Sequence, residues 1–242
     1  MINSTTALAG YATAAWDYGC VASTKAAAYL PAADAVRAQN RPIHELVKRS
    51  VDVTVATVGI ALTLPLWVVI ALAVKLTSKG PVFFAQERAG INGRPFRMFK
   101  FRTMVADAEA RLKDLVRFDE LAEPVYKLKH DPRVTRVGRF LRRFGLDELP
   151  QLLNVLRGEM SLVGPRPEVV ALAGRYNPEQ RRRLLVKPGI TGYQQIHNRG
   201  MPDMAARLVY DMYYLRNRSI PLDLWILAMT AFVIASGKEI TY

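Results

Sequence analysis

An uninterrupted apolar segment restricts what this chain can fold into more than any other feature. Residues Val51–Val74 read VDVTVATVGIALTLPLWVVIALAV and are apolar except for Asp52 and three threonines. As a helix at about 1.5 Å per residue, the segment is about 36 Å long, enough to cross a hydrocarbon core of about 30 Å. It is apolar on all sides, whereas a half-buried surface helix has a polar face.

The residues of this segment leave its topology open. Lys48 and Arg49 precede it, and Lys75 and Lys79 follow it. Such symmetric flanks do not orient a spanning helix by the positive-inside rule, but they suit a segment that enters and leaves on one face. Pro65 removes a backbone hydrogen bond near the middle, although spanning helices also contain proline. A spanning helix, a re-entrant helix and a buried helix of a soluble protein are the three alternatives.

A second apolar segment, Ile220–Ser236, is shorter. Pro221 and Asp223 lie in its first turn, where proline and acidic residues favour helix initiation. Roughly sixteen apolar residues are marginal for crossing a bilayer. We therefore expect a helix that lies at the interface or packs on the first segment.

Composition indicates anionic partners. Half of the 242 residues are hydrophobic, and the formal net charge is +13. A basic surface attracts nucleic acid, anionic lipid or a phosphorylated substrate. The single cysteine, Cys20, cannot form an intrachain disulfide, and with histidines at positions 44, 130 and 197 alone a zinc site is not expected.

The sequence between the apolar segments predicts a compact basic domain. Asn92-Gly93 separates the stretches PVFFAQERAG and RPFRMFKFR, which indicates a β-hairpin. Helical spacing follows in Asp107–Glu120 and in Val137–Phe144. The second helix gathers arginines that face solvent or lipid headgroups, or else bind a substrate phosphate: Arg136, Arg139, Arg142 and Arg143.

An acidic pair within these basic surroundings is the candidate for chemistry. Asp147 and Glu148 are adjacent, so on a helix they diverge by about 100° and cannot do the same task on one face. At a helix N-terminus an aspartate stays ionised and is a competent nucleophile toward phosphorus, while a neighbouring glutamate suits Mg²⁺. The alternative is that the pair only begins a helix, and its own spacing does not exclude this.

Two rigid turns follow the acidic pair. Gly164-Pro165-Arg166-Pro167 holds one arginine, which suits a fixed guanidinium fork against phosphate. Lys187–Gly192 is a second turn of this kind. Prolines also occur in ordinary linkers, so neither turn identifies a site by itself.

Together these features form six ordered blocks: Lys48-Arg49 with Asp52, an apolar segment broken at Pro65, Gly80–Phe84, Lys100–Met104, Leu146–Pro167 and Lys187–Gly192. The series closely resembles the bacterial sugar transferase family, the monotopic phosphoglycosyl transferases that initiate capsule, exopolysaccharide and O-antigen synthesis. The resemblance covers roughly residues 46 to 240 and is to short-form members of the exopolysaccharide-initiating type.

The resemblance implies a ping-pong reaction. Asp147 takes the place of the nucleophile that accepts a sugar phosphate from a UDP-sugar and releases UMP, and undecaprenyl (polyprenyl) phosphate then accepts the phosphosugar. Glu148, together with Asp147, takes the place of the Mg²⁺ ligands. The expected substrate-binding residues are Lys100, Arg102, Arg142, Pro165, Arg166, Gln195 and Arg199.

The resemblance also implies a fold and a location. The class is α+β and mostly helical, with a broken re-entrant membrane helix, a small β-hairpin and amphipathic helices lying at the interface. Both ends of the membrane helix, and the catalytic domain, are expected on the cytoplasmic side of the bacterial inner membrane. The expected parts are a flexible leader without a secretory signal (1–41), the membrane helix-break-helix (42–77), the catalytic domain (78–218) and a C-terminal apolar helix with its tail (219–242).

Two stretches depart from the family pattern. The family often has Ser-Pro at the break, whereas this chain has Leu64-Pro65, so Thr63 is a candidate polar partner there. The usual Trp-Ala-Gln-Val-Asn-Gly-Arg is replaced by Tyr193–Arg199, a change that bears on sugar preference. Hexoses and N-acetylated or diamino sugars all stay open, with a slight preference for a hexose.

Two other kinds of function compete with this interpretation. A membrane-anchored adaptor would use its basic face to hold anionic lipid without catalysis. A nucleic-acid-binding protein rests on charge alone, and we expect no nucleic acid partner because no known binding module is recognisable. The lipid bilayer is an expected partner, and the oligomeric state is open, with a homodimer as one alternative.

Overall fold

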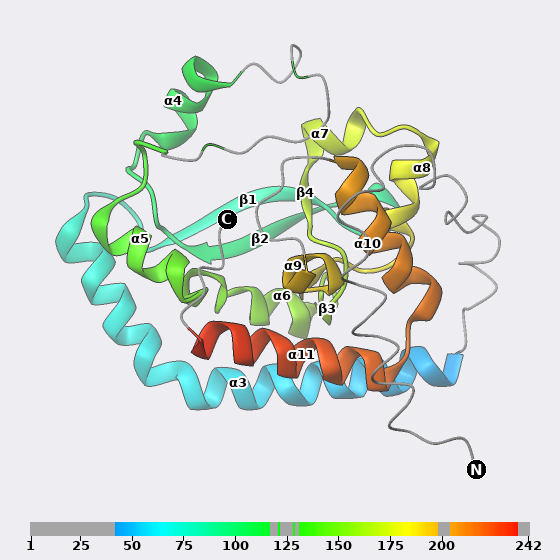
Figure 1. The fold of residues 1–242 in the computed structure, drawn as a ribbon. Helices are drawn as coiled ribbons and strands as arrows, with labels where there is room; N and C mark the ends of the chain where they lie inside the picture. Colours follow the sequence, from blue (N-terminus) through cyan, green and yellow to red (C-terminus); the bar gives the residue numbers. More distant parts are fainter. Residues whose placement is uncertain (1–41, 117–120, 122–127, 129–130, 198–203, 237–242) are drawn as a thin grey trace.

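The computed structural model describes residues 42–116, 121, 128, 131–197 and 204–236. The leader expected at 1–41 lies outside this part of the chain. Helices predominate in the described residues and the sheets are small (Figure 1), which confirms the expected mostly helical class with a small hairpin sheet. The elements, with η denoting a short 3₁₀ helix, are α3 (Pro42–Thr77), β1 (Phe83–Ala89), η3 (Ile91–Gly93), β2 (Pro95–Phe101), α4 (Ala108–Leu115), α5 (Arg136–Arg143), η4 (Leu146–Glu148), α6 (Gln151–Arg157), β3 (Ser161–Val163), β4 (Glu168–Val169), α7 (Val170–Gly174), α8 (Pro178–Arg181), η5 (Arg182–Leu185), β5 (Gly189–Thr191), α9 (Tyr193–His197), α10 (Met204–Asn217) and α11 (Ile220–Ala235).

The first apolar segment is one helix of 36 residues, α3, with Pro65 inside it. In Figure 1 this helix runs along the lower edge of the molecule and then bends upward at its C-terminal end. The Thr63 hydroxyl donates to the carbonyl of Gly59 at 2.6 Å and accepts from the Trp67 indole at 3.1 Å. Helix bending is typical of both an internal proline and such a back-bonded threonine. The expected break is thus a bend within a continuous helix.

Most apolar side chains of α3 point away from the rest of the described chain. The exposed ones include Val55, Val58, Leu62, Leu64, Val68, Val69, Leu72 and Leu76. A helix buried in the core of a soluble protein would instead hide such side chains. The described residues therefore favour a membrane helix over the third alternative, and α3 is long and apolar enough to cross a bilayer.

Polar residues near the N-terminal end of α3 face inward and hold the helix to the domain. Lys48 donates to the carbonyl of Val163 at 3.2 Å and lies 2.5 Å from the Asp223 carboxylate. The carboxylate of Asp52 accepts from the backbone N–H of Leu162 at 3.1 Å. Arg49 donates to two carbonyls at the C-terminal end of α6, those of Val155 and Leu156. These contacts give the polar side chains of an apolar helix fixed partners.

The predicted β-hairpin is present. β1 and β2 pair antiparallel from Phe83 opposite Phe101 to Ala89 opposite Pro95. Asn92 lies between them in the left-handed region at φ 55°, which asparagine tolerates better than most residues. β4 extends this sheet by pairing with the other edge of β1. The open end of the hairpin packs on α3, where the rings of Trp67 and Phe101 meet edge to face at 5.6 Å.

A second sheet joins the two rigid turns. β3 and β5 pair in parallel, with Ser161 opposite Gly189. The turn that follows β3 then lies directly against the segment that precedes β5, because the N–H of Gly189 donates to the carbonyl of Pro165 at 2.9 Å. A Cβ at Gly164 would lie 2.5 Å from the Lys187 carbonyl oxygen, so only glycine allows this approach.

The second apolar segment forms α11, which lies alongside α3 in Figure 1. Its Asp223 contacts Lys48 of α3 and also accepts from the Tyr214 hydroxyl at 2.8 Å. Packing on the first segment is thereby confirmed. The main core lies between these helices, α6, α10 and the small parallel sheet, and its largest fully buried side chains include Tyr214, Met160, Met212, Leu215 and Ile226.

Candidate active site

A sharp change of direction after α5 creates the acidic pair. Gly145 ends the helix in the left-handed conformation at φ 66°, and η4 begins with the next residue. Both acids fall in the first turn of this short helix, directly before α6. The sequence predicted a helix start here. Asp147 and Glu148 are nevertheless only 3% and 5% exposed, unlike the solvated first-turn acids of an ordinary surface helix.

Cations from distant parts of the chain surround this pair. Lys100 of β2 places its ammonium 2.8 Å from a Glu148 oxygen and 3.9 Å from Oδ2 of Asp147. Arg166, in the turn after β3, has its guanidinium 3.8 Å from the same Glu148 oxygen. Glu148 is thus the residue that collects the two cations, whereas Asp147 lies beside them.

The two oxygens of Asp147 have different surroundings. Oδ2 faces Lys100, whereas Oδ1 is buried without a hydrogen-bond partner among the described residues. Burial raises the pKa of Asp147 above its usual range, and the Lys100 ammonium acts in the opposite direction. An oxygen that no donor engages retains its lone pairs for a reacting atom, which suits a nucleophile.

Arg142 reaches the site from the inner face of α5. Its Nε donates to the Thr103 hydroxyl at 2.9 Å. The helix can approach this closely because Gly138 has no side chain, since a Cβ there would lie 2.0 Å from the Thr103 carbonyl oxygen. Burial lowers the pKa of Arg142, and the nearby Asp147 carboxylate opposes that shift. The arginine remains the third cation next to the acidic pair.

These groups open into a cavity of about 590 Å³, a size typical of small-molecule sites. Eight basic side chains and four carboxylates share its wall with apolar residues of the hairpin, so positive charge predominates. A cavity with this charge suits an anionic substrate such as a phosphate ester. The predicted residues that line it are Lys100, Arg102, Arg142, Asp147, Arg166 and Gln195.

The structure places the other predicted substrate-binding residues differently. Arg102 lines the cavity, but its guanidinium donates to the carbonyl and hydroxyl of Ser78, both at 2.8 Å. Pro165 lies in the turn behind Arg166, where its carbonyl is bonded to Gly189. Arg199 lies outside the described residues. Substrate binding by these residues stays a prediction.

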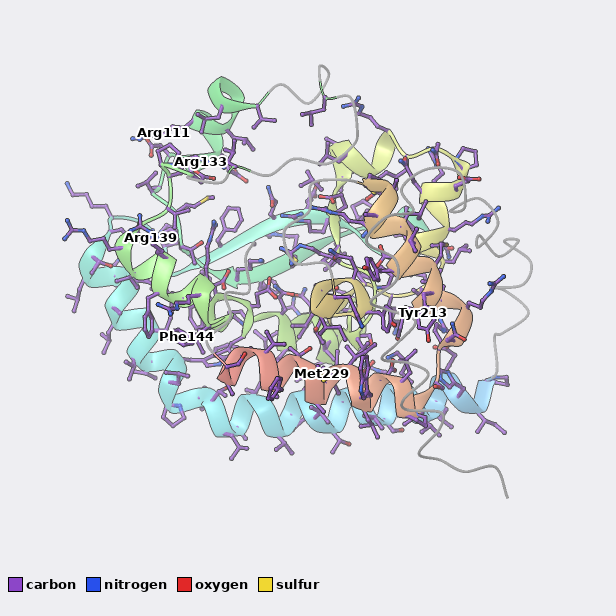
Figure 2. All side chains as sticks on the ribbon, viewed as in Figure 1. Arg111, Arg133, Arg139, Phe144, Tyr213 and Met229 are labelled. Atoms are coloured by element: carbon purple, nitrogen blue, oxygen red, sulfur yellow. The ribbon has the colours of Figure 1, made fainter. Side chains whose placement is uncertain are left out.

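Sequence reasoning missed a second charged group in the same cavity. Glu168 lies between Arg88 and Arg207, with nearest oxygen–nitrogen distances of 3.7 Å and 3.6 Å. Arg133, which Figure 2 shows beside α4, also lines the wall and is paired with Asp131 at 2.6 Å. Arg88 lies in the predicted hairpin and Glu168 directly follows the Gly164–Pro167 turn, so their positions in the sequence could have indicated a role in the site. Arg207 lies on a helix without a motif and had no such signal.

The acidic pair fits the Mg²⁺ expected from the sequence. Magnesium prefers one or two carboxylates together with water and substrate phosphate oxygens over a cage made wholly of protein ligands. Asp147 offers an oxygen without a hydrogen-bond partner in the described residues, and Glu148 lies next to it. The described part of the chain has no group of three or more candidate metal ligands, so the remaining ligands would be water and substrate.

Comparison with known proteins identifies the family. The profile described as "Bacterial sugar transferase" matches residues 43–237. This chain belongs to the bacterial sugar transferase family. The matched range includes all of α3 but its first residue, the acidic pair, both rigid turns and α11, so every element that forms the cavity is part of the family domain.

Relatives of this sugar transferase carry informative names. It is 40% identical over 195 residues to the galactosyl transferase CpsE of Streptococcus agalactiae, covering 80% of this chain and 43% of the relative. It is 42% identical over 203 residues to the UDP-glucose:undecaprenyl-phosphate glucose-1-phosphate transferase of Escherichia coli, covering 78% and 40%.

A third relative is similar in length. The exopolysaccharide production protein ExoY of Rhizobium meliloti is 42% identical over 194 residues, covering 78% of this chain and 86% of ExoY. The chain thus spans about two fifths of the length of the first two relatives and most of the third.

Proposed function

We propose that this protein is a phosphoglycosyl transferase that moves a sugar-1-phosphate from a UDP-sugar to undecaprenyl phosphate and so initiates exopolysaccharide, capsule or O-antigen synthesis. The observation that carries this proposal is the buried Asp147 carboxylate, whose Oδ1 has no hydrogen-bond partner in the described residues, next to three cations in one cavity. The name of the Escherichia coli relative supports the donor and acceptor, and the name of ExoY supports the pathway.

The proposed reaction has two displacement steps at one phosphorus atom. An Asp147 oxygen attacks the phosphorus that bears the sugar, the bond to the UMP oxygen breaks, and UMP leaves with the electron pair. A phosphate oxygen of undecaprenyl phosphate then attacks the same phosphorus. The bond to Asp147 breaks, which restores the carboxylate and releases undecaprenyl diphosphate-sugar. Because the two anionic substrates react in turn, they never need to meet.

Nearby side chains have separate roles in this scheme. Lys100 favours the ionised form of Asp147, because its ammonium opposes the burial that raises the carboxyl pKa. Arg142 and Arg166 bind the phosphate oxygens of the donor and stabilise their charge during transfer. Mg²⁺ held by Asp147 and Glu148 would supply further positive charge to the phosphoryl group.

Intact-mass analysis tests the nucleophile. Membrane-purified protein is incubated with Mg²⁺ and a panel of UDP-sugars without acceptor. The expected result is a mass increase equal to one sugar phosphate, with stoichiometric UMP, and its absence from the Asp147→Asn variant. An adaptor would show neither. A protein that turns over but forms no adduct with any donor would contradict the covalent step.

We further propose a hexose donor. Relatives are named for glucose or galactose transfer, and the donor panel separates UDP-glucose and UDP-galactose from N-acetylated and diamino sugars. A mass increase matching a hexose phosphate is expected. An increase with N-acetylated donors alone would refute the preference.

We propose a re-entrant topology for α3 in the inner membrane, with the catalytic domain in the cytoplasm. The bend at Thr63 and Pro65, the exposed apolar face and the basic residues at both ends support it. In a Cys20→Ser background, single cysteines at the exposed positions Ile43 and Leu76 should both react with an impermeant label from the cytoplasmic side only. Labelling from opposite sides would mean a spanning helix.

A further inference from the structure

The turn that carries Arg166 has few backbone donors with which to hold its own carbonyl groups. Two of its residues, Pro165 and Pro167, have no backbone N–H. The turn therefore offers mainly carbonyl groups, and donors from elsewhere in the chain must hold them. The conformation of this turn sets the direction of the Arg166 guanidinium. That guanidinium lies 3.8 Å from Glu148 at the cavity wall.

Three successive carbonyls of this turn accept from three separate segments. The carbonyl of Pro165 accepts from the N–H of Gly189 at 2.9 Å. The carbonyl of Pro167 accepts from Arg88 of β1 at 3.4 Å. Between them, the carbonyl of Arg166 accepts from the guanidinium of Arg183 at 3.3 Å. Of these three donors, Arg183 alone is an almost fully buried charged side chain, 3% exposed.

The guanidinium of Arg183 is itself fixed from two other directions. It lies 2.8 Å from the carboxylate of Asp211 on α10, and both side chains are nearly inaccessible. Its other terminal nitrogen donates to the Tyr176 hydroxyl at 2.9 Å. A planar fork with several donors in fixed directions suits such simultaneous contacts, which a single ammonium could not all make. Arg183 thus connects α10, the segment before α8 and the Arg166 turn.

Stability alone does not account for this buried ion pair. Two charges lose their hydration on burial, and replacing such a pair with apolar residues of similar volume is often neutral or stabilising. An ion pair that also bonds to the backbone of a turn has a different effect, because it fixes the geometry of that turn.

We propose that Arg183, held by Asp211, is a positioning residue that sets the Arg166 guanidinium for the phosphates of the donor. The inference rests on the proposed function, in which Arg166 binds those phosphates. Arg183 itself does not touch the substrate. A misplacement of about 1 Å at a reacting centre costs on the order of a hundredfold in rate, so the loss of this contact has a measurable effect.

The test removes both charges at once. The double variant Arg183→Met with Asp211→Leu leaves no unpaired buried charge, so its melting temperature should stay close to wild type. We expect kcat/KM for the UDP-sugar, measured as UMP release, to fall about 10- to 100-fold. The control is Arg182→Met on the same short helix, which should keep wild-type kinetics. A folded double variant within twofold of wild type would overturn the proposal.

A mutant cycle with Arg166→Ala separates an effect that acts through Arg166 from a general disturbance of the structure. If Arg183 acts through Arg166, the double variant should cause little further loss once Arg166 is alanine, because coupled residues are not additive. A loss as large as in the wild-type background would overturn the proposal. If the double variant does not fold, Arg183→Lys takes its place in the cycle. The lysine keeps the charge next to Asp211 but lacks the planar guanidinium. Wild-type kinetics in the Arg183→Lys variant would overturn the positioning role.

The same mutant cycle can be measured as UDP affinity, which does not depend on turnover. Calorimetric titration with UDP reports the phosphate contacts even if the chemistry differs from the one proposed. A wild-type protein that binds UDP but transfers no sugar refutes the proposed function and leaves the cycle intact. A protein whose UDP affinity is unchanged by Arg166→Ala refutes the role of Arg166 and, with it, this inference.

Discussion

The ammonium of Lys48 lies 2.5 Å from the carboxylate of Asp223, which joins the second turn of α3 to the first turn of α11. The two residues are far apart in the sequence, and their side chains are 12% and 9% exposed. The pair therefore fixes where α3 meets the catalytic domain, and it can be tested without reference to catalysis.

We predict that Asp223→Asn destabilises the protein strongly. Removing one partner of a buried ion pair leaves the other uncompensated, at a typical cost of about 3–5 kcal/mol, which the residual 9–12% exposure reduces somewhat. Thermal unfolding in nanodiscs measures the effect. The control is Asp107→Asn, whose pair with Arg111 is more than half exposed and contributes little. Equal melting temperatures for both variants would contradict the prediction.

The pH dependence of activity should report the environment of Asp147. Burial raises the carboxyl pKa and Lys100 opposes that effect. The nucleophile must be ionised, so kcat/KM should fall at the acid end, at a pH above the ordinary aspartate range. Lys100→Met removes the cation that favours the ionised form. We expect the acid limb to move to higher pH in this variant, whatever its maximal rate, and to stay in place in Lys79→Met.

Two arginines of the cavity should behave differently when replaced. The guanidinium of Arg102 is bonded to Ser78, so Arg102→Ala should lower stability by about 1–3 kcal/mol with little change in the KM of the donor. Arg142 lies next to Asp147, so Arg142→Ala should impair turnover by a much larger factor than it lowers stability. Steady-state kinetics and thermal unfolding of both variants check this contrast. A raised donor KM in Arg102→Ala at unchanged stability would assign Arg102 to substrate binding instead.

The bend of α3 should depend on two residues. Pro65→Ala restores a backbone donor, and Thr63→Val removes the hydroxyl that bonds to Gly59. We expect the double variant to straighten the helix, so that cysteines at Ile43 and Leu76 become labelled from opposite sides of the membrane. Leu64→Ala, an exposed neighbour, is the control and should leave both labels on one side. Unchanged labelling in the double variant would show that other contacts hold the bend.

Local signals made part of the fold predictable. Asn92-Gly93 predicted the hairpin because these two residues accept the left-handed conformation that the turn requires. The acidic turn was predictable as a helix start because acidic residues favour the first turn of a helix. The pairing of β3 with β5 had no such signal, because each strand has three residues, too few to show an alternating pattern.

The candidate site could be predicted only from the order of the motifs. The contacts that hold its residues in place could not be predicted. Arg102 follows Lys100 by two residues, which on a continuing strand would place both on one face. The strand ends at Phe101, and Arg102 turns toward Ser78 instead. Arg183 and Asp211 belong to none of the motifs, and a contact between distant helices leaves no trace in the local sequence pattern.

The contacts of α3 also bear on how the chain is made. Arg49, Asp52 and Lys48 bind partners that lie 106, 110 and 175 residues later in the sequence. Under the proposed topology, α3 reaches the bilayer before those partners are made, so its polar side chains must wait until more than 100 further residues have been added. Only when α11 emerges can the last of these contacts close. Loss of α11 should therefore leave nascent chains in which this contact never forms, and exposed, incompletely packed chains of this kind are prone to aggregation.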